Sequence, residues 1–323
     1  MIVTLTVNPS LDRTVELGAE LERGEVQRVD RSVEEPGGKG VNVTRALVAA
    51  GAPSVAVLPG RTDDPLVAAL ARVGLPVVTV PIAARLRSNI TISEPGGVTT
   101  KLNEPGPALG DAEQRALVGS VVDRSADASW LVLAGSLPPS LPADFYVRVV
   151  REARAAGVRA RIAVDTSGAP LAALVGSEVE VDLVKPNGEE LAELLGEPDA
   201  DALEADPERV AELAARLAPR GIRSALVTLG AHGAVLATDG GAWFAPAPRI
   251  HARSTVGAGD SSLAGYLLAT TEGAVPERAL AQAVAHGAAA ASLPGSAVPT
   301  REQADASAVT VTRIRGAVAP AIH

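Results

Sequence analysis

The segment Ser254-Thr-Val-Gly-Ala-Gly-Asp260-Ser261 contains the residue types that chemistry on an anion would need. Its three small residues at 257–259 let the backbone turn tightly with N–H groups pointing inward. A helix is predicted to follow at once, because Leu263, Tyr266 and Leu267 repeat at helical spacing. Inward N–H groups at a helix N-terminus bind anions, and the helix dipole adds positive potential.

The negative charge of the aspartate in this segment opposes anion binding, so its presence there suggests a catalytic role. Asp260 would have one if it took a proton from a hydroxyl while the amides of Gly257, Ala258 and Gly259 held a phosphoryl group. An ordinary glycine-rich turn capped by an aspartate has the same pattern, so the residues alone leave both readings open.

A second motif, Pro36-Gly-Gly-Lys39-Gly-Val-Asn42, is predicted to open another helix. Its adjacent glycines let the backbone approach a ligand, and Lys39 and Asn42 could then reach anionic and hydroxyl groups. The motif is not a P-loop, and the first strand leads into Asn8-Pro-Ser-Leu-Asp12 instead of a dinucleotide-binding glycine fingerprint. A simple helix start fits Gly-Gly-Lys-Gly equally well.

A third motif, Lys185-Pro-Asn187-Gly-Glu-Glu190, follows a buried strand. Ligands of open α/β sheets lie at the carboxyl ends of strands, so these polar residues are suitably placed. Asn187 and Glu190 could organise water around Mg²⁺, which keeps several waters in proteins. The alternative is a helix that starts with Asn187 as N-cap and glutamates in its first turn.

Short aliphatic runs alternate with amphipathic stretches along the chain. The helix-like stretches include 64–74 and 207–217, the latter with Asp206 as N-cap and Pro207 at the first position. The strand-like runs are 2–7, 54–58, 77–80, 130–134, 162–164, 181–184 and 225–229. This alternation predicts βαβ units, hence an α/β fold with a mostly parallel central sheet between two helical layers.

Two segments, approximately 10–35 and 85–105, break this pattern and are predicted to form a small β-sheet lid. They contain two strand pairs, 13–17 with 26–31 and 89–93 with 98–102, and the second pair encloses the turn signal Glu94-Pro-Gly-Gly97. The rest of residues 1–323 is predicted to be one domain. A lid would exclude water that competes with an acceptor hydroxyl.

Composition limits the classes of function. Hydrophobic residues make up 47% and aromatic residues 2%, so the core must be aliphatic. The formal net charge of -9 argues against a nucleic-acid partner. There is no cysteine, and His232, His251, His286 and His323 lack the paired spacing of zinc ligands. No signal peptide or membrane span is recognised, so a cytoplasmic protein without a membrane partner is expected.

Together the motifs resemble the ribokinase-like sugar kinases of the phosphofructokinase-B family, over nearly the whole chain. They occur as Gly-Gly-Lys-Gly-Val-Asn at 37–42, Lys-Pro-Asn-Gly-Glu-Glu at 185–190 and Thr-Val-Gly-Ala-Gly-Asp at 255–260. The segments 6–14, 103–107, 135–139 and 292–295 are most similar to 1-phosphofructokinases, with tagatose-6-phosphate kinases as close relatives. The resemblance implies a three-layer α/β/α sandwich with a lid.

The resemblance also implies roles for the matching residues. It implies Asp260 as general base with an anion hole at 257–259, and a magnesium ion held by Glu190 with Asn187, largely through water. The phosphosugar would be bound by Asp12, Gly38, Lys39, Asn42, Arg87, Asn89 and Asn103. ATP would be bound by Lys185, Asn187, Thr228, Gly230, Gly233, Val256, Gly259 and His286, with adenine near Val256 and the helix at 286–290.

The implied reaction is ATP-dependent phosphorylation of fructose 1-phosphate at its C6 hydroxyl, with Mg²⁺. Tagatose 6-phosphate and fructose 6-phosphate are alternative acceptors, and a non-catalytic sugar-phosphate sensor is an alternative of another class. Ser88 and Lys101 depart from the expected lid pattern and bear on the choice of sugar. The lid strands predict exposed edges and an apolar face, which a homodimer through the lid would cover.

Overall fold

A ten-stranded sheet forms the centre of the computed structural model, which describes residues 1–177 and 179–314. The strands lie in the order β14-β13-β12-β11-β10-β9-β8-β1-β4-β5. Neighbours from β11 to β5 are parallel, whereas β12, β13 and β14 are antiparallel at one edge. The bounds are β1 Ile2–Leu5, β4 Ser54–Pro59, β5 Val77–Val80, β8 Trp130–Ala134, β9 Arg161–Asp165, β10 Leu183–Val184, β11 Ser224–Thr228, β12 Ala234–Thr238, β13 Gly241–Ala245 and β14 Thr312–Ile314.

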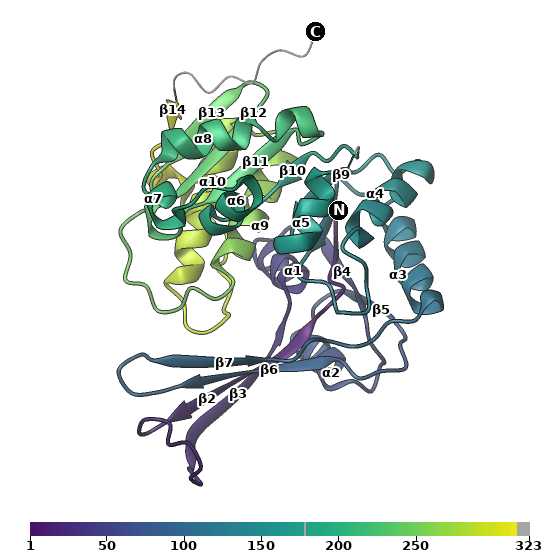
Figure 1. Cartoon of the computed structure of the whole chain (residues 1–323), viewed down its shortest axis with the longest axis vertical. Coiled ribbons are helices and arrows are strands. Elements are labelled where there is room, and N and C mark those ends of the chain that lie inside the picture. Colours follow the sequence, from purple (N-terminus) through teal and green to yellow (C-terminus); the bar gives the residue numbers. More distant parts are fainter. Residues whose placement is uncertain (178, 315–323) are drawn as a thin grey trace.

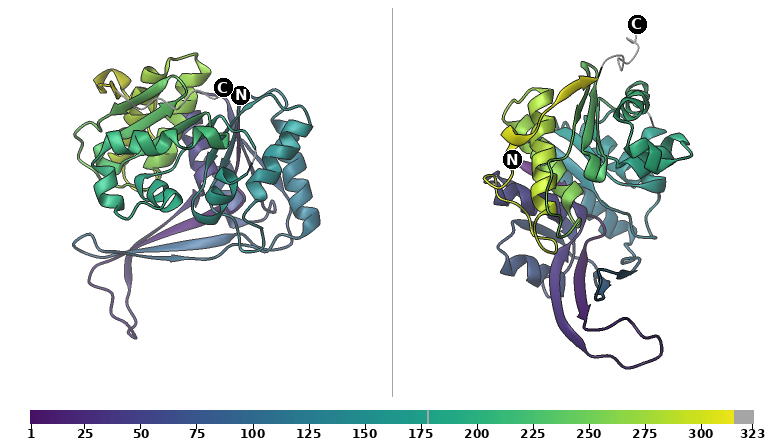
Figure 2. Two further views of the ribbon diagram at one scale, coloured as in Figure 1. Left: turned by 45° about the horizontal axis from the view of Figure 1, so that its top comes forward. Right: turned by 90° about the vertical axis from the view of Figure 1, so that its left-hand side faces the viewer.

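Alternate side chains of each strand enter separate hydrophobic clusters on the two faces of this sheet. Val3 and Leu5 pack with the helices at 111–124, 145–155, 168–175, 188–195 and 207–215. Ile2 packs with the helices at 39–49, 258–271 and 276–291. Figures 1 and 2 show these two helical layers on either side of the sheet. The three-layer, mostly parallel α/β fold predicted from the sequence is therefore confirmed.

Two helices, α2 and α8, begin with a capping aspartate followed by proline. Asp64 accepts a hydrogen bond from the Leu66 N–H at the start of α2, and Asp206 accepts one from the Arg209 N–H at the start of α8. The bounds are α1 Lys39–Ala49, α2 Pro65–Arg72, α3 Asp111–Arg124, α4 Phe145–Ala155, α5 Gly168–Val175, α6 Gly188–Leu195, α7 Ala200–Glu204, α8 Pro207–Ala215, α9 Ala258–Thr271 and α10 Pro276–Ala291.

A separate four-stranded sheet, here called the lid, extends below the main body in Figure 1. Its order is β3-β2-β6-β7, with β2 Ser10–Leu17, β3 Val29–Gly37, β6 Arg87–Ser93 and β7 Thr99–Asn103. The predicted hairpin around 94–97 joins β6 to β7 in antiparallel pairing. β2 and β6 are parallel, so the two lid segments meet side by side.

The prediction of a lid strand at 26–31 was wrong in its bounds. Val26 is 98% exposed and precedes the strand, which starts at Val29 and continues to Gly37. β3 is an edge strand, so Pro36 is tolerated near its end although it lacks an N–H group. The strand therefore leads directly into α1 and carries the glycine motif to the junction of lid and body.

The hairpin of β12 and β13 was not predicted from the sequence. Asp239-Gly240 lies between these strands and is a common turn dipeptide between apolar runs. As for the membrane, no helix among the described residues is both long and apolar enough to span one.

Candidate active site

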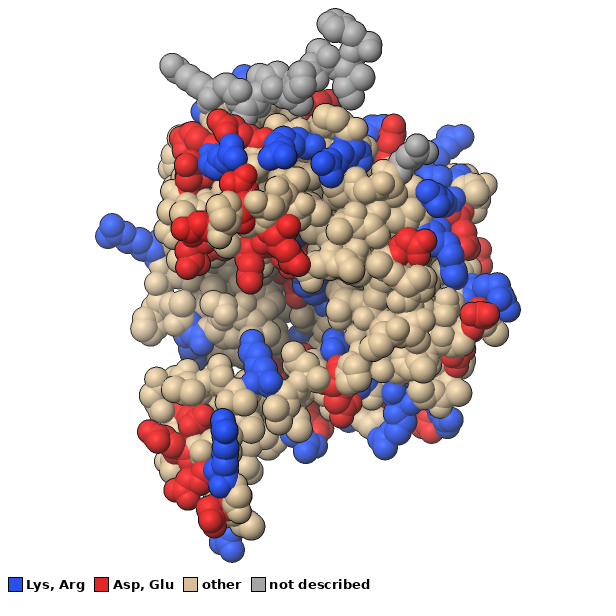
Figure 3. Space-filling view, viewed as in Figure 1, with Lys and Arg blue, Asp and Glu red and all other residues tan. Residues whose placement is uncertain are grey.

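Part of the predicted site lies at the carboxyl ends of the parallel strands and part in the lid. The predicted residues Lys185 and Thr228 follow β10 and end β11, and Asp165, which was not among the predicted residues, ends the neighbouring β9. Because these strands are parallel neighbours, their ends lie at one edge of the sheet. Figure 3 shows the molecule hollowed between the lid and the main body on this side.

Asp260 lies in the first turn of α9, behind a glycine that has left-handed backbone geometry. Gly257 is the N-cap with φ 74°, and the small residues 257–259 are partly exposed while Asp260 is 8% exposed. The first N–H groups of a helix have no partner inside it, so those of α9 are available to an anion. This local structure is the one that the sequence predicted.

The Asp260 carboxylate is held by the second motif. Asn42 Nδ2 donates to Asp260 Oδ2 over 2.8 Å. Burial, followed by repulsion from Asp165, raises the pKa of Asp260 to about 6 against the ordinary 3.8, although Lys39, Asn42 and Lys185 oppose the shift. The carboxylate is therefore charged at neutral pH yet more basic than a surface aspartate, which suits a general base.

Lys39 and Lys185 meet at Asp165. Lys39 Nζ donates to Asp165 Oδ1 over 2.6 Å, and Lys185 Nζ lies 3.1 Å from Asp165 Oδ2. Burial would lower the pKa of Lys39, but Asp165 and then Glu190 raise it above its usual value. A Cβ atom on Gly259 would lie 3.5 Å from Lys185 Nζ, so this ammonium group adjoins the start of α9.

At the lid end of the site, the side chain of Asp12 is fixed by its neighbours. Its Oδ1 accepts from Ser10 Oγ over 2.7 Å and from Asn89 Nδ2 over 2.9 Å. A Cβ atom on Gly37 would lie 2.0 Å from Asp12 Oδ2, so only glycine allows the carboxylate to lie against this backbone. Asp12 and Asn89 therefore adjoin the glycine motif.

Arg87 spans the base of the lid. Its Nε donates to the Asn8 carbonyl over 3.2 Å and its Nη1 to the Glu104 carbonyl over 3.1 Å. Asn8 in turn donates through Nδ2 to Ser136 Oγ over 3.3 Å. These contacts hold the guanidinium in one orientation while the residue stays partly exposed.

Strand register places the two departures in the lid on opposite faces. Asn89 pairs with Asn103 and Thr91 with Lys101, so Lys101 shares the face of Asp12 and Asn89. Ser88 alternates to the other face, and its N–H donates to Glu104 Oε2 over 2.8 Å. Of the two departures, only Lys101 shares the face of Asp12 and Asn89.

Asn187 and Glu190 form the capping box that the sequence offered as the alternative reading. Glu190 N–H donates to Asn187 Oδ1 over 2.6 Å, and Asn187 N–H donates to Glu190 Oε2 over 2.9 Å. Glu190 Oε1 lies 3.9 Å from Lys39 Nζ, so the second carboxylate oxygen faces the site. Cap and metal ligand are compatible here, because Mg²⁺ needs only one or two carboxylates beside phosphates and water.

No group of three or more histidine, aspartate or glutamate side chains within 1–177 and 179–314 could hold a metal ion by itself. His323 lies outside the described residues.

The predicted nucleotide loop follows β11. Asn187 and Thr228 form a parallel bridge, and Gly230 and Gly233 have φ of 53° and 118°. A Cβ atom on Gly233 would lie 2.0 Å from the Ala245 carbonyl oxygen, so the loop packs tightly on the β13 end. Gly230 is exposed and Thr228 is partly exposed, whereas Gly233 is buried.

Val256 and His286 occupy different environments. Val256 is 45% exposed beside the start of α9. The His286 ring is fully buried, and Nδ1 lies 3.0 Å from the Gln282 carbonyl oxygen. Because the imidazole ring of His286 has no exposed surface, it is not placed to contact a nucleotide as predicted. The partly exposed residues of this helix are 287–289.

Comparison with known proteins decides the family. Residues 6–303 match the model of the pfkB family carbohydrate kinases. The chain belongs to the pfkB family. It is 34% identical to 1-phosphofructokinase of Haloferax volcanii, over 98% of this chain and 99% of that protein. It is also 34% identical to ATP-dependent 6-phosphofructokinase isozyme 2 of Mycobacterium tuberculosis, over 94% of this chain and 88% of that protein.

Among solved structures, Escherichia coli phosphofructokinase-2 in complex with fructose-6-phosphate matches with a TM-score of 0.83 and 30% identity, covering 94% of this chain and 96% of that one. This chain is therefore an ATP-dependent sugar kinase of the phosphofructokinase type, with a ribokinase-like fold.

In this pfkB kinase, sequence reasoning missed one central residue, Asp165. The signal was present, because an aspartate directly after the apolar run 162–164 ends a buried parallel strand at the edge where ligands bind. Asn8 and Ser136 stood within recognised motifs, and only the fold showed that they contact each other.

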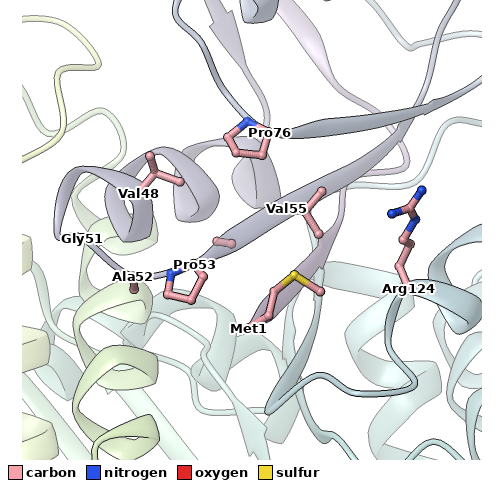
Figure 4. A pocket seen from close by; sticks show the side chains of 9 residues that line it. Met1, Val48, Gly51, Ala52, Pro53, Val55, Pro76 and Arg124 are labelled. Atoms are coloured by element: carbon pink, nitrogen blue, oxygen red, sulfur yellow. The ribbon is translucent and has the colours of Figure 1, made fainter.

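A hollow of about 560 Å³ lies at the other end of the sheet, lined mainly by apolar side chains (Figure 4). Met1, Pro53, Val55 and Pro76 border it at the starts of β1, β4 and β5. The titratable groups of the candidate site lie at the carboxyl ends of the strands, so this hollow is no part of that site.

Proposed function

We propose that this kinase transfers the γ-phosphate of Mg·ATP to the C6 hydroxyl of fructose 1-phosphate, giving fructose 1,6-bisphosphate. The observation that carries the proposal is the position of Asp260. It lies in the first turn of α9 and is hydrogen-bonded to Asn42. Lys39 and Lys185 lie at the same edge of the sheet, where both pair with Asp165. A base and a cluster of anion-binding groups thus lie at one place.

In this proposal Asp260 accepts the proton of the C6 hydroxyl as that oxygen attacks the γ-phosphorus. The bond from the γ-phosphorus to the β,γ-bridging oxygen breaks, and ADP leaves. The amides of 257–259 stabilise the charge on the transferred group. Positioning and charge neutralisation supply most of the rate in such reactions.

Arg87 and Lys39 would bind the 1-phosphate of the sugar. Arg87 offers a planar fork that two backbone carbonyls already orient, whereas Lys39 acts as a point charge. Asp12, Asn89 and Asn103 share the lid face that would contact sugar hydroxyls.

On the nucleotide side, Lys185, Thr228 and Gly230 would contact ATP, and the buried Gly233 would shape the loop that carries Gly230. The Oε1 atom of Glu190, which the capping box does not use, would hold Mg²⁺ together with phosphate oxygens and water, with Asn187 nearby. The ion would supply charge neutralisation on the transferred phosphate.

The choice of fructose 1-phosphate rests on the 1-phosphofructokinase relatives and on the motifs at 6–14, 103–107 and 135–139. Fructose 6-phosphate is the first alternative, since relatives named 6-phosphofructokinase are equally similar. Tagatose 6-phosphate is a further alternative, and Lys101 on the site face bears on this choice.

The test is ³¹P NMR of the product formed from fructose 1-phosphate and Mg·ATP. The proposal predicts fructose 1,6-bisphosphate in amounts equal to the ADP released. ADP without a second phosphate ester on the sugar would contradict it. Measurable ATP binding with no turnover on any of the three phosphosugars would favour the sensor.

The role of Arg87 is tested with a matched pair. Arg87→Met should raise KM for the phosphosugar on the order of 100-fold and change KM for ATP little. Arg85→Met is the control, because Arg85 lies two residues away on the exposed surface. Equal rises in both KM values would place Arg87 outside the sugar site.

We also propose that two copies associate through the lids. Val15, Ile90, Ile92 and Leu102 share the lid face opposite Asp12 by strand register, and Leu102 is 53% exposed. These four side chains form an apolar patch on that face beside Arg13 and Glu34, and an exposed apolar patch is expected to be covered.

Light scattering at micromolar concentration should give the mass of a dimer, and Leu102→Glu should give a monomer. Val275→Glu is the control, since Val275 is 55% exposed on the main body. A monomeric wild-type protein would contradict the proposal.

A further inference from the structure

Asp165 is the terminal residue of β9 and is fully buried at the base of the site. Its carbonyl accepts the Gly135 N–H over 2.9 Å, so the backbone is tied to the adjacent strand connection. Its two carboxylate oxygens face different lysines, at 2.6 Å and 3.1 Å. A buried carboxylate needs such partners, and the two lysines keep the pKa of Asp165 low in spite of its burial.

The two lysines come from separate parts of the chain. Lys39 is the first residue of α1 and belongs to the Gly-Gly-Lys motif on the sugar side. Lys185 follows β10, is 4% exposed and adjoins Gly259 on the nucleotide side. One carboxylate therefore fixes the two ammonium groups on which the proposed function relies for both substrates.

Asp260 lies close enough to this cluster to feel all three charges. If either ammonium group paired with Asp260 directly, the carboxylate would lose its affinity for a proton and become a poor base. In the structure Asp260 instead accepts from the neutral amide of Asn42. Glu190, 3.9 Å from Lys39, and Arg45, whose Nη1 donates to Asn42 Oδ1 over 3.4 Å, are further charged neighbours.

We infer that Asp165 is a positioning residue that keeps Lys39 and Lys185 paired away from Asp260, so that both lysines face phosphate groups and Asp260 remains a base. The inference rests on the proposed role of Asp260. It goes beyond that role, because it assigns Asp165 the task of separating the cations from the base.

The test is the pH dependence of kcat and kcat/KM in Asp165→Asn. The wild-type acid limb is expected near pH 6. In the variant a repelling charge is gone and the lysines are free to approach Asp260, and both changes lower the pKa of Asp260. The acid limb should therefore move to lower pH, toward the ordinary carboxylate range. kcat/KM for each substrate should also fall on the order of 100-fold, because the lysines are misplaced.

Asp182→Asn is the matched control. Asp182 precedes β10 at the opposite end of the sheet, where it accepts the Ile162 N–H over 2.8 Å. This variant should keep the wild-type acid limb even if its stability falls. If the acid limb of Asp165→Asn coincides with those of wild type and Asp182→Asn, the inference is overturned. Asp165 would then have a structural role only.

Asp260→Asn, measured in parallel, separates this inference from the proposed function. If Asp260→Asn keeps turnover, the base role itself is wrong. If Asp260→Asn is inactive and Asp165→Asn leaves the acid limb in place, only the inference fails.

Should Asp165→Asn not fold or lose measurable turnover, the double variant Asp165→Asn/Lys185→Gln removes the excess buried positive charge. Calorimetry should then show about tenfold weaker binding of fructose 1-phosphate than in Lys185→Gln alone, because Lys39 has lost its anchor. Equal binding in the two proteins would overturn the inference.

Discussion

Replacing Asp260 by asparagine should make the protein more stable while it abolishes most of the activity. Asp260 is 8% exposed, and its pKa is raised from 3.8 to about 6. Because the folded-state pKa is the higher one, the charged carboxylate destabilises the folded protein above pH 6. A shift of this size corresponds to about 3 kcal/mol at neutral pH. Asparagine keeps the shape and a hydrogen-bond acceptor for Asn42 without the charge.

The stability gain must depend on pH in a defined direction. The penalty is absent below about pH 4, where Asp260 is protonated in both states, and complete above pH 6. Thermal unfolding of Asp260→Asn should therefore show a Tm about 5 °C above wild type at pH 8, with the difference vanishing near pH 4. kcat should fall about 100-fold or more, since general-base catalysis has that magnitude.

Asp63→Asn is the control, because Asp63 is an exposed carboxylate whose pKa is lowered by Arg61. It should give no gain in Tm at pH 8. A lower or unchanged Tm for Asp260→Asn at pH 8 would refute the view that Asp260 is a buried, strained base.

Two further predictions concern the frame of the site. Gly233→Ala should destabilise the protein by on the order of 2 kcal/mol or more and raise KM for ATP, because its backbone has φ 118° and a Cβ would lie 2.0 Å from the Ala245 carbonyl oxygen. Gly240→Ala, with no heavy atom nearer than 3.6 Å, should melt like wild type, and equal behaviour of the two variants would contradict the packing argument. Tyr146→Phe should cost about 1 kcal/mol in urea unfolding, because it removes the hydroxyl that donates to the Gly135 carbonyl over 3.0 Å while Thr166 still satisfies that oxygen. A loss above about 3 kcal/mol would mean that the hydroxyl supports more than this bond.

The sequence was sufficient for features that depend on local or periodic signals. Asp206-Pro207 predicted the start of α8, and Gly-Ala-Gly followed by apolar residues predicted the turn into α9. The antiparallel edge of the sheet was not predicted, although Asp239-Gly240 between two apolar runs is a hairpin signal. The bounds of β3 were misjudged because exposed Val26 resembled a strand residue, although tertiary pairing with β2 decides the strand.

Contacts between distant motifs could not be predicted from spacing. Asn42 and Asp260 stand 218 residues apart, and their hydrogen bond follows from the packing of α1 against α9. Asp165 does not belong to a recognisable sequence motif. Its importance follows from its ion pairs with two lysines, which lie near it only in the folded protein. The burial of His286 against Gly265 likewise follows from helix packing, which a run of small residues leaves undefined.

The central claim is a preference for fructose 1-phosphate as acceptor, and the most direct test is the ratio of kcat/KM for fructose 1-phosphate to that for fructose 6-phosphate, measured by ADP release with saturating Mg·ATP. We expect a ratio well above one, with kcat/KM for tagatose 6-phosphate also below that for fructose 1-phosphate. A ratio below one would keep the kinase and contradict the assigned acceptor.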